Sequence, residues 1–168
     1  MRASLGRIDD LAARGEEIFL TIVLGLLSLL IVLAVVFRYV VNDPLTWSEE
    51  LIILMFVWVV FIGTAHAFRM RSHIVIDVIL LFAPLWVRVM MGAISAAATL
   101  AVLVAVGWYG WHYTMRELPN LTPMLGISSA WSVAPLVASC VLSVLHILRR
   151  LADEGPQSAV WVDAIPKE

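Results

Sequence analysis

The segment FRYVVNDPLTWSEE, residues 37–50, separates two long apolar runs and decides how this chain folds. It contains the turn sequence Asn42-Asp43-Pro44 and places several charged side chains next to stretches that have none. Ionisable groups beside a bilayer are costly unless they are paired or hydrated. We therefore predict a hairpin between two membrane helices here, with its polar side chains gathered where the chain reverses.

The apolar runs identify the chain as a membrane protein. Of its 168 residues, 62% are apolar, against about 45–50% in soluble domains. A helix needs about 20 mainly apolar residues to cross the hydrocarbon core. Residues 1–150 are therefore predicted to form one all-α membrane domain, followed by a flexible tail at 151–168. The four transmembrane helices are expected at about residues 18–41, 47–68, 85–115 and 128–148.

The arginines are distributed unevenly between the two ends of these helices. One end holds Arg38 and Arg116, beside an aromatic belt that includes Trp47 and Trp108. Positively charged loops tend to stay in the cytoplasm, so both termini and the tail are predicted to be cytoplasmic. No basic cluster is dense enough to suggest nucleic-acid binding. The arginines at the other end are Arg2, Arg7, Arg14, Arg69, Arg71, Arg88, Arg149 and Arg150.

Two short segments are predicted to lie at the membrane surface. Leu5, Ile8 and Ala12 mark one face of an N-terminal amphipathic helix. Residues 74–82 are apolar but too short to span, which indicates an interfacial helix before the third span. Cys140 is the single cysteine, so a disulfide framework is excluded.

Small residues in the predicted spans indicate helix contacts. In lipid, small side chains let helix backbones approach closely and gain dispersion contacts. We expect these contacts to be internal, because a four-helix protein must first hold itself together, with contact to another subunit as the alternative. The positions are Gly25, Gly63, Ala93, Ala97, Ala101 and Ala105.

The charged residues of the hairpin have structural explanations. Thr46-x-x-Glu49 fits a capping box, and Glu49 and Glu50 lie at the positive end of the second helix. Arg38 falls in the last turn of the first helix, and an unpaired arginine costs about 2.5–3.5 kcal/mol at the bilayer centre. We hypothesise that it pairs with Glu49 or Glu50, or across a subunit boundary. Snorkelling to the outer headgroups is the alternative.

The histidines permit a second interpretation. His66 and His146 are near the inner ends of their helices, where they could ligate haem in the membrane anchor of an oxidoreductase. Interfacial or capping roles explain them more simply. His73 and Asp77 are four residues apart, which favours an ordinary salt bridge on the inner surface, with an arginine such as Arg69 nearby.

The sequence argues against an enzyme and against a self-sufficient transporter. It contains no nucleophile triad and no phosphate-binding glycine loop. The interiors of the predicted spans, at residues 18–37, 51–68, 89–115 and 128–148, lack Asp, Glu, Lys and Arg. Ion-coupled carriers need such groups, or broken helices near the membrane midplane. We therefore expect an accessory membrane subunit.

The pattern RYxxNxPLxWxEE at residues 38–50 resembles the signature of the small membrane subunit of TRAP transporters, the DctQ-like family. The resemblance continues through GTA at 63–65, Arg69 and HIxID at 73–77. It covers about residues 14–150, and the order and spacing of these pieces make it fairly specific.

This resemblance implies a tripartite system of the bacterial inner membrane. A periplasmic binding protein would deliver an organic acid, commonly a carboxylate, to a large DctM-like subunit that carries it inward with sodium. The small subunit would be a scaffold without a cofactor. A haem-bearing anchor stays the alternative. Residue by residue, the resemblance implies hairpin fixation and subunit contact for Arg38, Asn42, Pro44, Trp47, Glu49 and Glu50, and an inner-surface loop with Arg69, His73 and Asp77.

Overall fold

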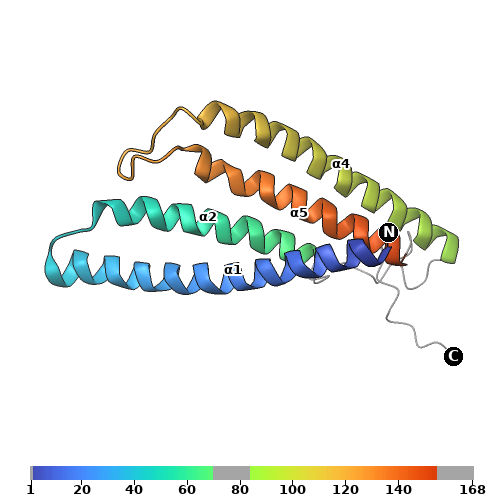
Figure 1. Ribbon diagram of the computed structural model, residues 1–168, viewed down its shortest axis with the longest axis horizontal. Coiled ribbons are helices and arrows are strands. Elements are labelled where there is room, and N and C mark those ends of the chain that lie inside the picture. Colours follow the sequence, from blue (N-terminus) through green and yellow to red (C-terminus); the bar gives the residue numbers. More distant parts are fainter. Residues whose placement is uncertain (1, 70–83, 155–168) are drawn as a thin grey trace.

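The computed structural model describes residues 2–69 and 84–154, and within them the chain forms four long helices (Figure 1). Each is long and apolar enough to cross a membrane, which confirms the prediction of an all-α protein with four spans. A short π-helical turn, η1, extends the first helix before the chain reverses. The elements are α1 (Arg2–Val36), η1 (Phe37–Val41), α2 (Thr46–Arg69), α4 (Leu85–Glu117) and α5 (Ala130–Glu154).

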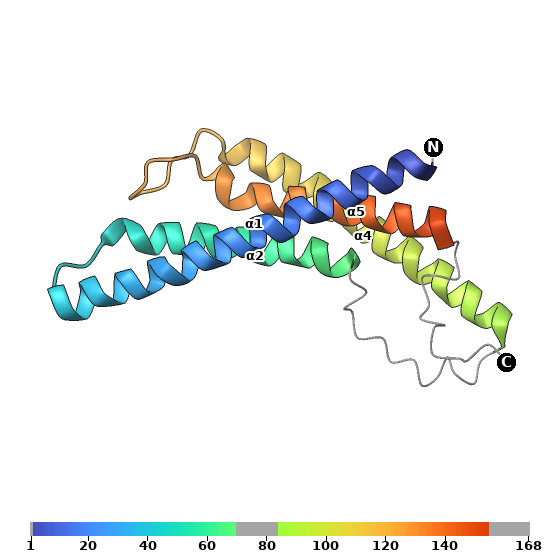
Figure 2. The ribbon, with the colours of Figure 1, turned by 60° about the horizontal axis from the view of Figure 1, so that its bottom comes forward.

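The helices form two antiparallel hairpins, α1 with α2 and α4 with α5, joined through α2 and α5. We call the end with the turn 42–45 and the loop 118–129 the hairpin end. The other is the termini end, where α1 begins and α5 finishes (Figure 1). α1 crosses over α2 toward α5 (Figure 2), and α4 packs on α5 at the opposite edge. The result is an elongated bundle in which α5 contacts the three other long helices.

The outer helices are longer than one bilayer crossing requires. α1 has 35 residues and α4 has 33, which corresponds to about 50 Å each at 1.5 Å per residue, against about 30 Å of hydrocarbon. The predicted N-terminal amphipathic helix is helical and runs without a break into the first span. α5 likewise continues to Glu154, so the predicted tail from residue 151 begins as helix.

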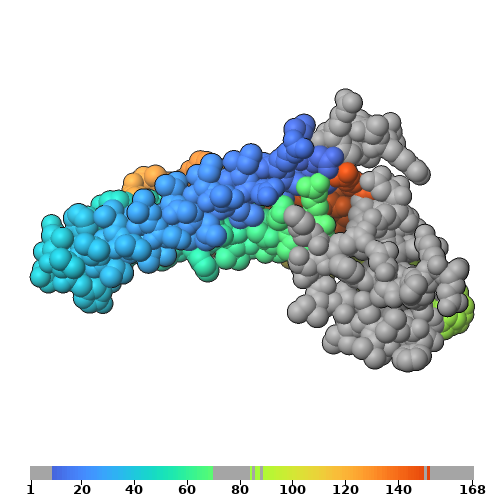
Figure 3. Space-filling model, turned by 90° about the horizontal axis from the view of Figure 1, so that it is seen from below, coloured from blue at the N-terminus to red at the C-terminus, as the bar shows by residue number. Residues whose placement is uncertain are grey.

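Large apolar side chains cover the outside of the bundle. Leu29 on α1, Ile53 on α2 and Val104 on α4 are each about 60% exposed in the isolated chain. Figure 3 shows α1 along one face, with part of α2 beside it. In a lipid environment such surfaces carry no hydrophobic penalty, which fits a protein whose solvent is the bilayer.

An aromatic contact holds α1, α2 and α5 together in the middle of the bundle. The ring centroids of Phe19 and Trp58 are 5.9 Å apart, and those of Trp58 and Trp131 are 6.2 Å apart. The Trp58 indole Nε1–H donates a hydrogen bond to the backbone oxygen of Trp131 at 3.1 Å. The indole of Trp58 is half-buried, and this bond gives its N–H a partner among the apolar side chains of the bundle.

The close contact between α4 and α5 uses glycines that the sequence interpretation did not select. A Cβ at Gly110 would lie 3.1 Å from Leu136 Cδ2, and one at Gly107 would lie 3.3 Å from Cys140 Cβ. The face of α4 that carries Ala93 and Ala101 is exposed instead.

The expectation of internal packing was therefore wrong for the alanine stripe, because Ala93, Ala97, Ala101 and Ala105 all lie on exposed surface of the chain. A Cβ added at Gly25 would meet nothing within 4 Å, whereas one added at Gly63 would make an ordinary contact with Leu20, at 3.9 Å. Contact of the stripe with another subunit stays a prediction. The predicted interfacial helix at 74–82 lies outside the described residues.

Candidate functional site

Polar side chains of the described chain gather at the two ends of the bundle, and the hairpin end holds the residues that the sequence singled out. There Arg38 of η1 donates a hydrogen bond to Glu49 of α2, across the turn. The two side chains are 52% and 60% exposed. Of the partners considered for Arg38, the structure therefore gives Glu49. Exposed pairs of this kind contribute about 0–1 kcal/mol.

The backbone of the turn depends on Asn42. This residue ends η1 in the left-handed region, with φ 56° and ψ 27°, and its N–H bonds to the backbone oxygen of Phe37. Asn tolerates this conformation better than most residues because its short side chain avoids the usual clash. Pro44 then restricts the backbone between the turn and α2, because its ring fixes φ. The sequence and geometry agree on where the chain reverses.

Glu50 has a different partner from its neighbour. Its Oε2 atom accepts hydrogen bonds from the backbone N–H groups of Met124, at 3.0 Å, and Leu125, at 2.8 Å. Both donors lie in the loop between α4 and α5. A single carboxylate therefore ties the α1–α2 hairpin to the α4–α5 hairpin, a contact that sequence spacing alone did not predict.

The start of α2 differs from the predicted capping box. Thr46 is the first residue of the helix, and the Glu49 carboxylate bonds Arg38 rather than the helix backbone. Ser48, which is buried, instead donates from its hydroxyl to the Leu45 oxygen at 2.6 Å. Trp47 is 39% exposed beside it, as an interfacial anchor would be. The capping box was therefore wrong, because the ion pair takes its carboxylate.

The termini end holds a denser set of charges, which we call the charge cluster. α1 contributes three carboxylates, and α2 and α5 each contribute a histidine and an arginine. Asp9, Glu16 and His146 are 1%, 4% and 4% exposed. The members are Asp9, Asp10, Glu16, His66, Arg69, His146 and Arg149.

His146 lies at the centre of the charge cluster. Its Nδ1 is 2.5 Å from Asp9 Oδ1, and its Nε2 is 2.9 Å from Glu16 Oε1. The other oxygen of Glu16, Oε2, is 3.1 Å from His66 Nδ1. Glu16 thus joins histidines from α2 and α5, while His146 joins two carboxylates of α1.

The arginines close the cluster on its more exposed side. Arg69 Nη2 donates to Asp10 Oδ1 at 2.7 Å, and its Nε is 3.4 Å from Asp9 Oδ2. Arg149 donates to Asp9 and, at 2.9 Å, to Asp10. Burying such charges is favourable only when they are well paired, and each carboxylate here meets at least one positive or hydrogen-bonding group.

The charge cluster was missed because its members are far apart in the chain, although a signal was present. Asp9 and Glu16 are seven residues apart on α1, so they share a face. His66 and Arg69 on α2, like His146 and Arg149 on α5, are three apart. At the same end of the bundle, α1 thus presents carboxylates, and α2 and α5 each present a histidine and an arginine that can pair with them.

The histidine contacts do not favour the haem-anchor interpretation. Both ring nitrogens of His146 face carboxylate oxygens, and Nδ1 of His66 faces Glu16. A haem ligand needs a ring nitrogen free to bind iron, and neither nitrogen of His146 is free. The two histidines therefore cannot serve together as axial ligands, although Nε2 of His66 is not engaged in these contacts. His73 and Asp77, which the sequence paired, lie outside the described residues, whereas Arg69 belongs to the charge cluster.

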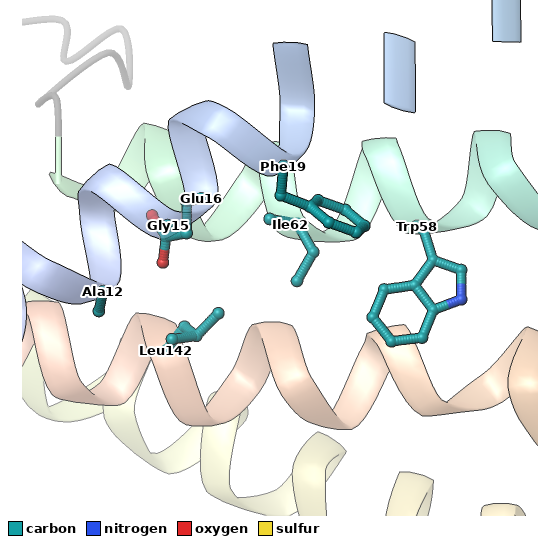
Figure 4. A pocket seen from close by; sticks show the side chains of 7 residues that line it. All are labelled: Ala12, Gly15, Glu16, Phe19, Trp58, Ile62 and Leu142. Carbon is teal, nitrogen blue, oxygen red and sulfur yellow. The ribbon is translucent and has the colours of Figure 1, made fainter. Parts of the chain in front are cut away.

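A cavity of about 220 Å³ lies next to the cluster, between α1, α2 and α5 (Figure 4). Phe19 and Trp58 stand at one side and Leu142 faces them from α5, while the carboxylate of Glu16 is at the other side. Its walls are otherwise apolar, with Ala12, Gly15 and Ile62. Both Glu16 oxygens already have histidine partners, so the cavity offers no free charge to a substrate.

This fold, with its paired charges at the two ends of apolar spans, can be compared with known proteins. The sequence model of the tripartite ATP-independent periplasmic transporters, DctQ component, matches residues 27–154. The chain belongs to the DctQ family. Proteins of this family are transporter components rather than enzymes, and the fold identifies this DctQ-family chain as a multi-pass membrane protein.

Individual relatives carry names from the same transporter class. The chain is 32% identical over 114 residues to the C4-dicarboxylate TRAP transporter small permease protein DctQ of Vibrio cholerae, which covers 66% of the chain and 49% of the relative. It is 31% identical over 117 residues to the sialic acid TRAP transporter small permease protein SiaQ of Vibrio cholerae. This alignment covers 68% of the chain and 66% of SiaQ. The chain thus spans about half the length of that DctQ protein.

A further DctQ-family likeness is found within a much longer protein. The sialic acid TRAP transporter permease protein SiaT of Haemophilus influenzae is 28% identical over 116 residues, which is 67% of this chain but 18% of SiaT. The aligned unit is therefore a small part of that permease polypeptide.

Proposed function

We propose that this chain is the small permease subunit of a TRAP transporter and supports a large permease subunit that imports organic acids. The observation that carries the proposal is the match of the DctQ component to residues 27–154. The likeness to a minor part of SiaT supports a partner of the large-permease type, because there a similar unit is continuous with a longer permease chain.

The distribution of charge supports an accessory role. The runs at residues 18–37, 51–68, 89–115 and 128–148 contain no Asp, Glu, Lys or Arg. Substrate and ion sites near a membrane midplane need charged side chains or interrupted helices, and the four long helices described here are continuous there. We infer that the substrate and sodium sites belong to the large subunit.

The names of the relatives support a carboxylate as the cargo. C4-dicarboxylates and sialic acid share at least one carboxylate group, although they differ in size and polarity. We infer an organic acid delivered by a periplasmic binding protein and carried with sodium. Which acid it is would be decided by those partners.

We further infer that both termini are cytoplasmic, in the bacterial inner membrane. The concentration of arginine at the termini end supports this orientation by the positive-inside rule. The hairpin end would then face the periplasm. A large subunit or a binding protein could then contact the residues at this end, which include Arg38, Trp47, Glu49 and Glu50.

Affinity purification from native membranes tests the proposal. The tagged chain is extracted in a mild detergent, co-purifying proteins are identified by mass spectrometry, and a visible spectrum is recorded. We expect a large multi-span TRAP permease and no Soret band. Oxidoreductase subunits together with a Soret band would contradict the proposal and favour the haem-bearing anchor.

A further inference from the structure

The contacts of His146 restrict the protonation states that the charge cluster can hold. A neutral imidazole has one N–H donor and one lone pair, whereas an ionised carboxylate only accepts hydrogen bonds. Nδ1 and Nε2 of His146 lie 2.5 and 2.9 Å from oxygens of Asp9 and Glu16. With both carboxylates ionised, a neutral ring would direct a lone pair at an anionic oxygen. The contact needs an additional proton.

The surrounding groups decide where that proton resides. Asp9 also accepts a hydrogen bond from Arg149 and is paired with Arg69, so both of its oxygens face donors. Glu16 faces His66, whose Nδ1 can donate as a neutral tautomer while Nε2 stays unprotonated. Neither carboxylate therefore needs to be neutral. The additional proton therefore resides on the ring of His146.

The partners of Glu16 lead to the same assignment. Glu16 is 4% exposed, and its ionic partners among the described residues are His66 and His146. The arginines Arg69 and Arg149 pair with Asp9 and Asp10 instead. Uncompensated buried charge is costly, so an ionised Glu16 favours a protonated histidine beside it.

We propose that His146 is held as an imidazolium and serves as a positioning residue, the cation that allows the two buried carboxylates of α1 to pack against α5. This inference does not depend on the proposed transport function. It assigns a role to a histidine that neither the hairpin nor the resemblance accounts for. It also accounts for the polar contacts by which α1 meets α5, from which it is separated by two other helices along the chain.

Nitrogen NMR of the full chain tests the assignment. Protein labelled with ¹⁵N-histidine is prepared in detergent micelles near neutral pH, with an affinity tag that lacks histidine. His66, His73 and His112 are replaced by glutamine, so that His146 is the remaining histidine. We expect two protonated ring nitrogens. A resonance from an unprotonated nitrogen would overturn the proposal.

Two neighbouring carboxylates provide a matched pair of variants in this background. With Glu16→Gln, the facing group can donate to Nε2, so a neutral ring becomes possible and an unprotonated nitrogen signal should appear. With Glu17→Gln the spectrum should not change, because Glu17 is exposed and its carboxylate has no described partner. Equal spectra for the two variants would contradict the role of Glu16.

If the triple replacement does not fold, the wild-type spectrum gives the same answer. The resonances lost in His146→Gln, or in the more conservative His146→Asn, then identify this ring among the four histidines of the chain. Loss of two protonated-nitrogen resonances supports the imidazolium. Loss of one protonated and one unprotonated resonance overturns it.

Discussion

Two adjacent glutamates, Glu49 and Glu50, show how differently similar side chains can act. Glu49 pairs with Arg38 in an exposed contact, while Glu50 accepts two backbone hydrogen bonds from the loop between α4 and α5. Bonds from backbone N–H groups to a carboxylate are charge-assisted and leave two donors without a partner when they are lost. We therefore assign to Glu50 the larger structural role.

Glu50→Gln is expected to loosen the loop at 118–129 and to lower the free energy of unfolding by about 1–3 kcal/mol, because a neutral amide oxygen accepts these two bonds more weakly than a carboxylate does. Glu49→Gln, the matched control, should cost about 0–1 kcal/mol. Thermal unfolding in one detergent and limited proteolysis of the loop measure the difference. A larger effect of Glu49→Gln would contradict this ranking.

A second pair of neighbours allows the same comparison in the charge cluster. Glu16→Gln removes one buried negative charge and leaves His146 and His66 without their shared anion, which typically costs about 3–5 kcal/mol. Glu17→Gln, at an exposed position, should stay within about 0.5 kcal/mol of the wild type. Chemical or thermal unfolding in the same detergent provides the measurement. Equal losses would show that the cluster is not a stabilising unit.

At the scale of helices, the sequence predicted the spans well but not the faces on which they pack. Runs without charge locate the membrane segments directly, since each charge within a span is expensive. Packing faces depend on which helices become neighbours, and small residues do not specify a neighbour. Thus Ala97 is exposed, whereas Gly110, which the spacing rule omitted, lies against Leu136.

The contact between α4 and α5 can be tested at its closest point. In Gly110→Val, the new side chain would overlap Leu136 and Val137, whose atoms are 3.1 and 3.3 Å from an added Cβ. Overpacking of this kind costs about 1–3 kcal/mol. Gly25→Val is the control, because nothing lies within 4 Å of its Cβ position. If both variants unfolded at the same temperature in detergent, the described α4–α5 contact would be wrong.

The sequence predicted the side-chain contacts at one end of the bundle better than those at the other. At the hairpin end, Arg38 and Glu49 are eleven residues apart on either side of a recognisable turn, so local reasoning was enough to suggest their pairing. Glu16 and His146 are separated by 130 residues. Their meeting depends on how the two hairpins assemble, which no local pattern determines.

For the whole molecule, we propose the role of a support rather than a conduit. The described spans are joined by aromatic packing near Trp58 and by polar contacts at both ends. Their exposed surfaces carry many large apolar side chains. The structure therefore fits the accessory role that we propose for the DctQ family member.

Uptake into proteoliposomes tests this central claim most directly. The large permease that co-purifies with the chain is reconstituted with its binding protein, with and without the chain, and with an organic acid that raises the melting temperature of that binding protein. The account predicts sodium-driven uptake when both membrane subunits are present, and none with the chain alone. Equal uptake by the large permease without the chain, or uptake by the chain alone, would contradict it.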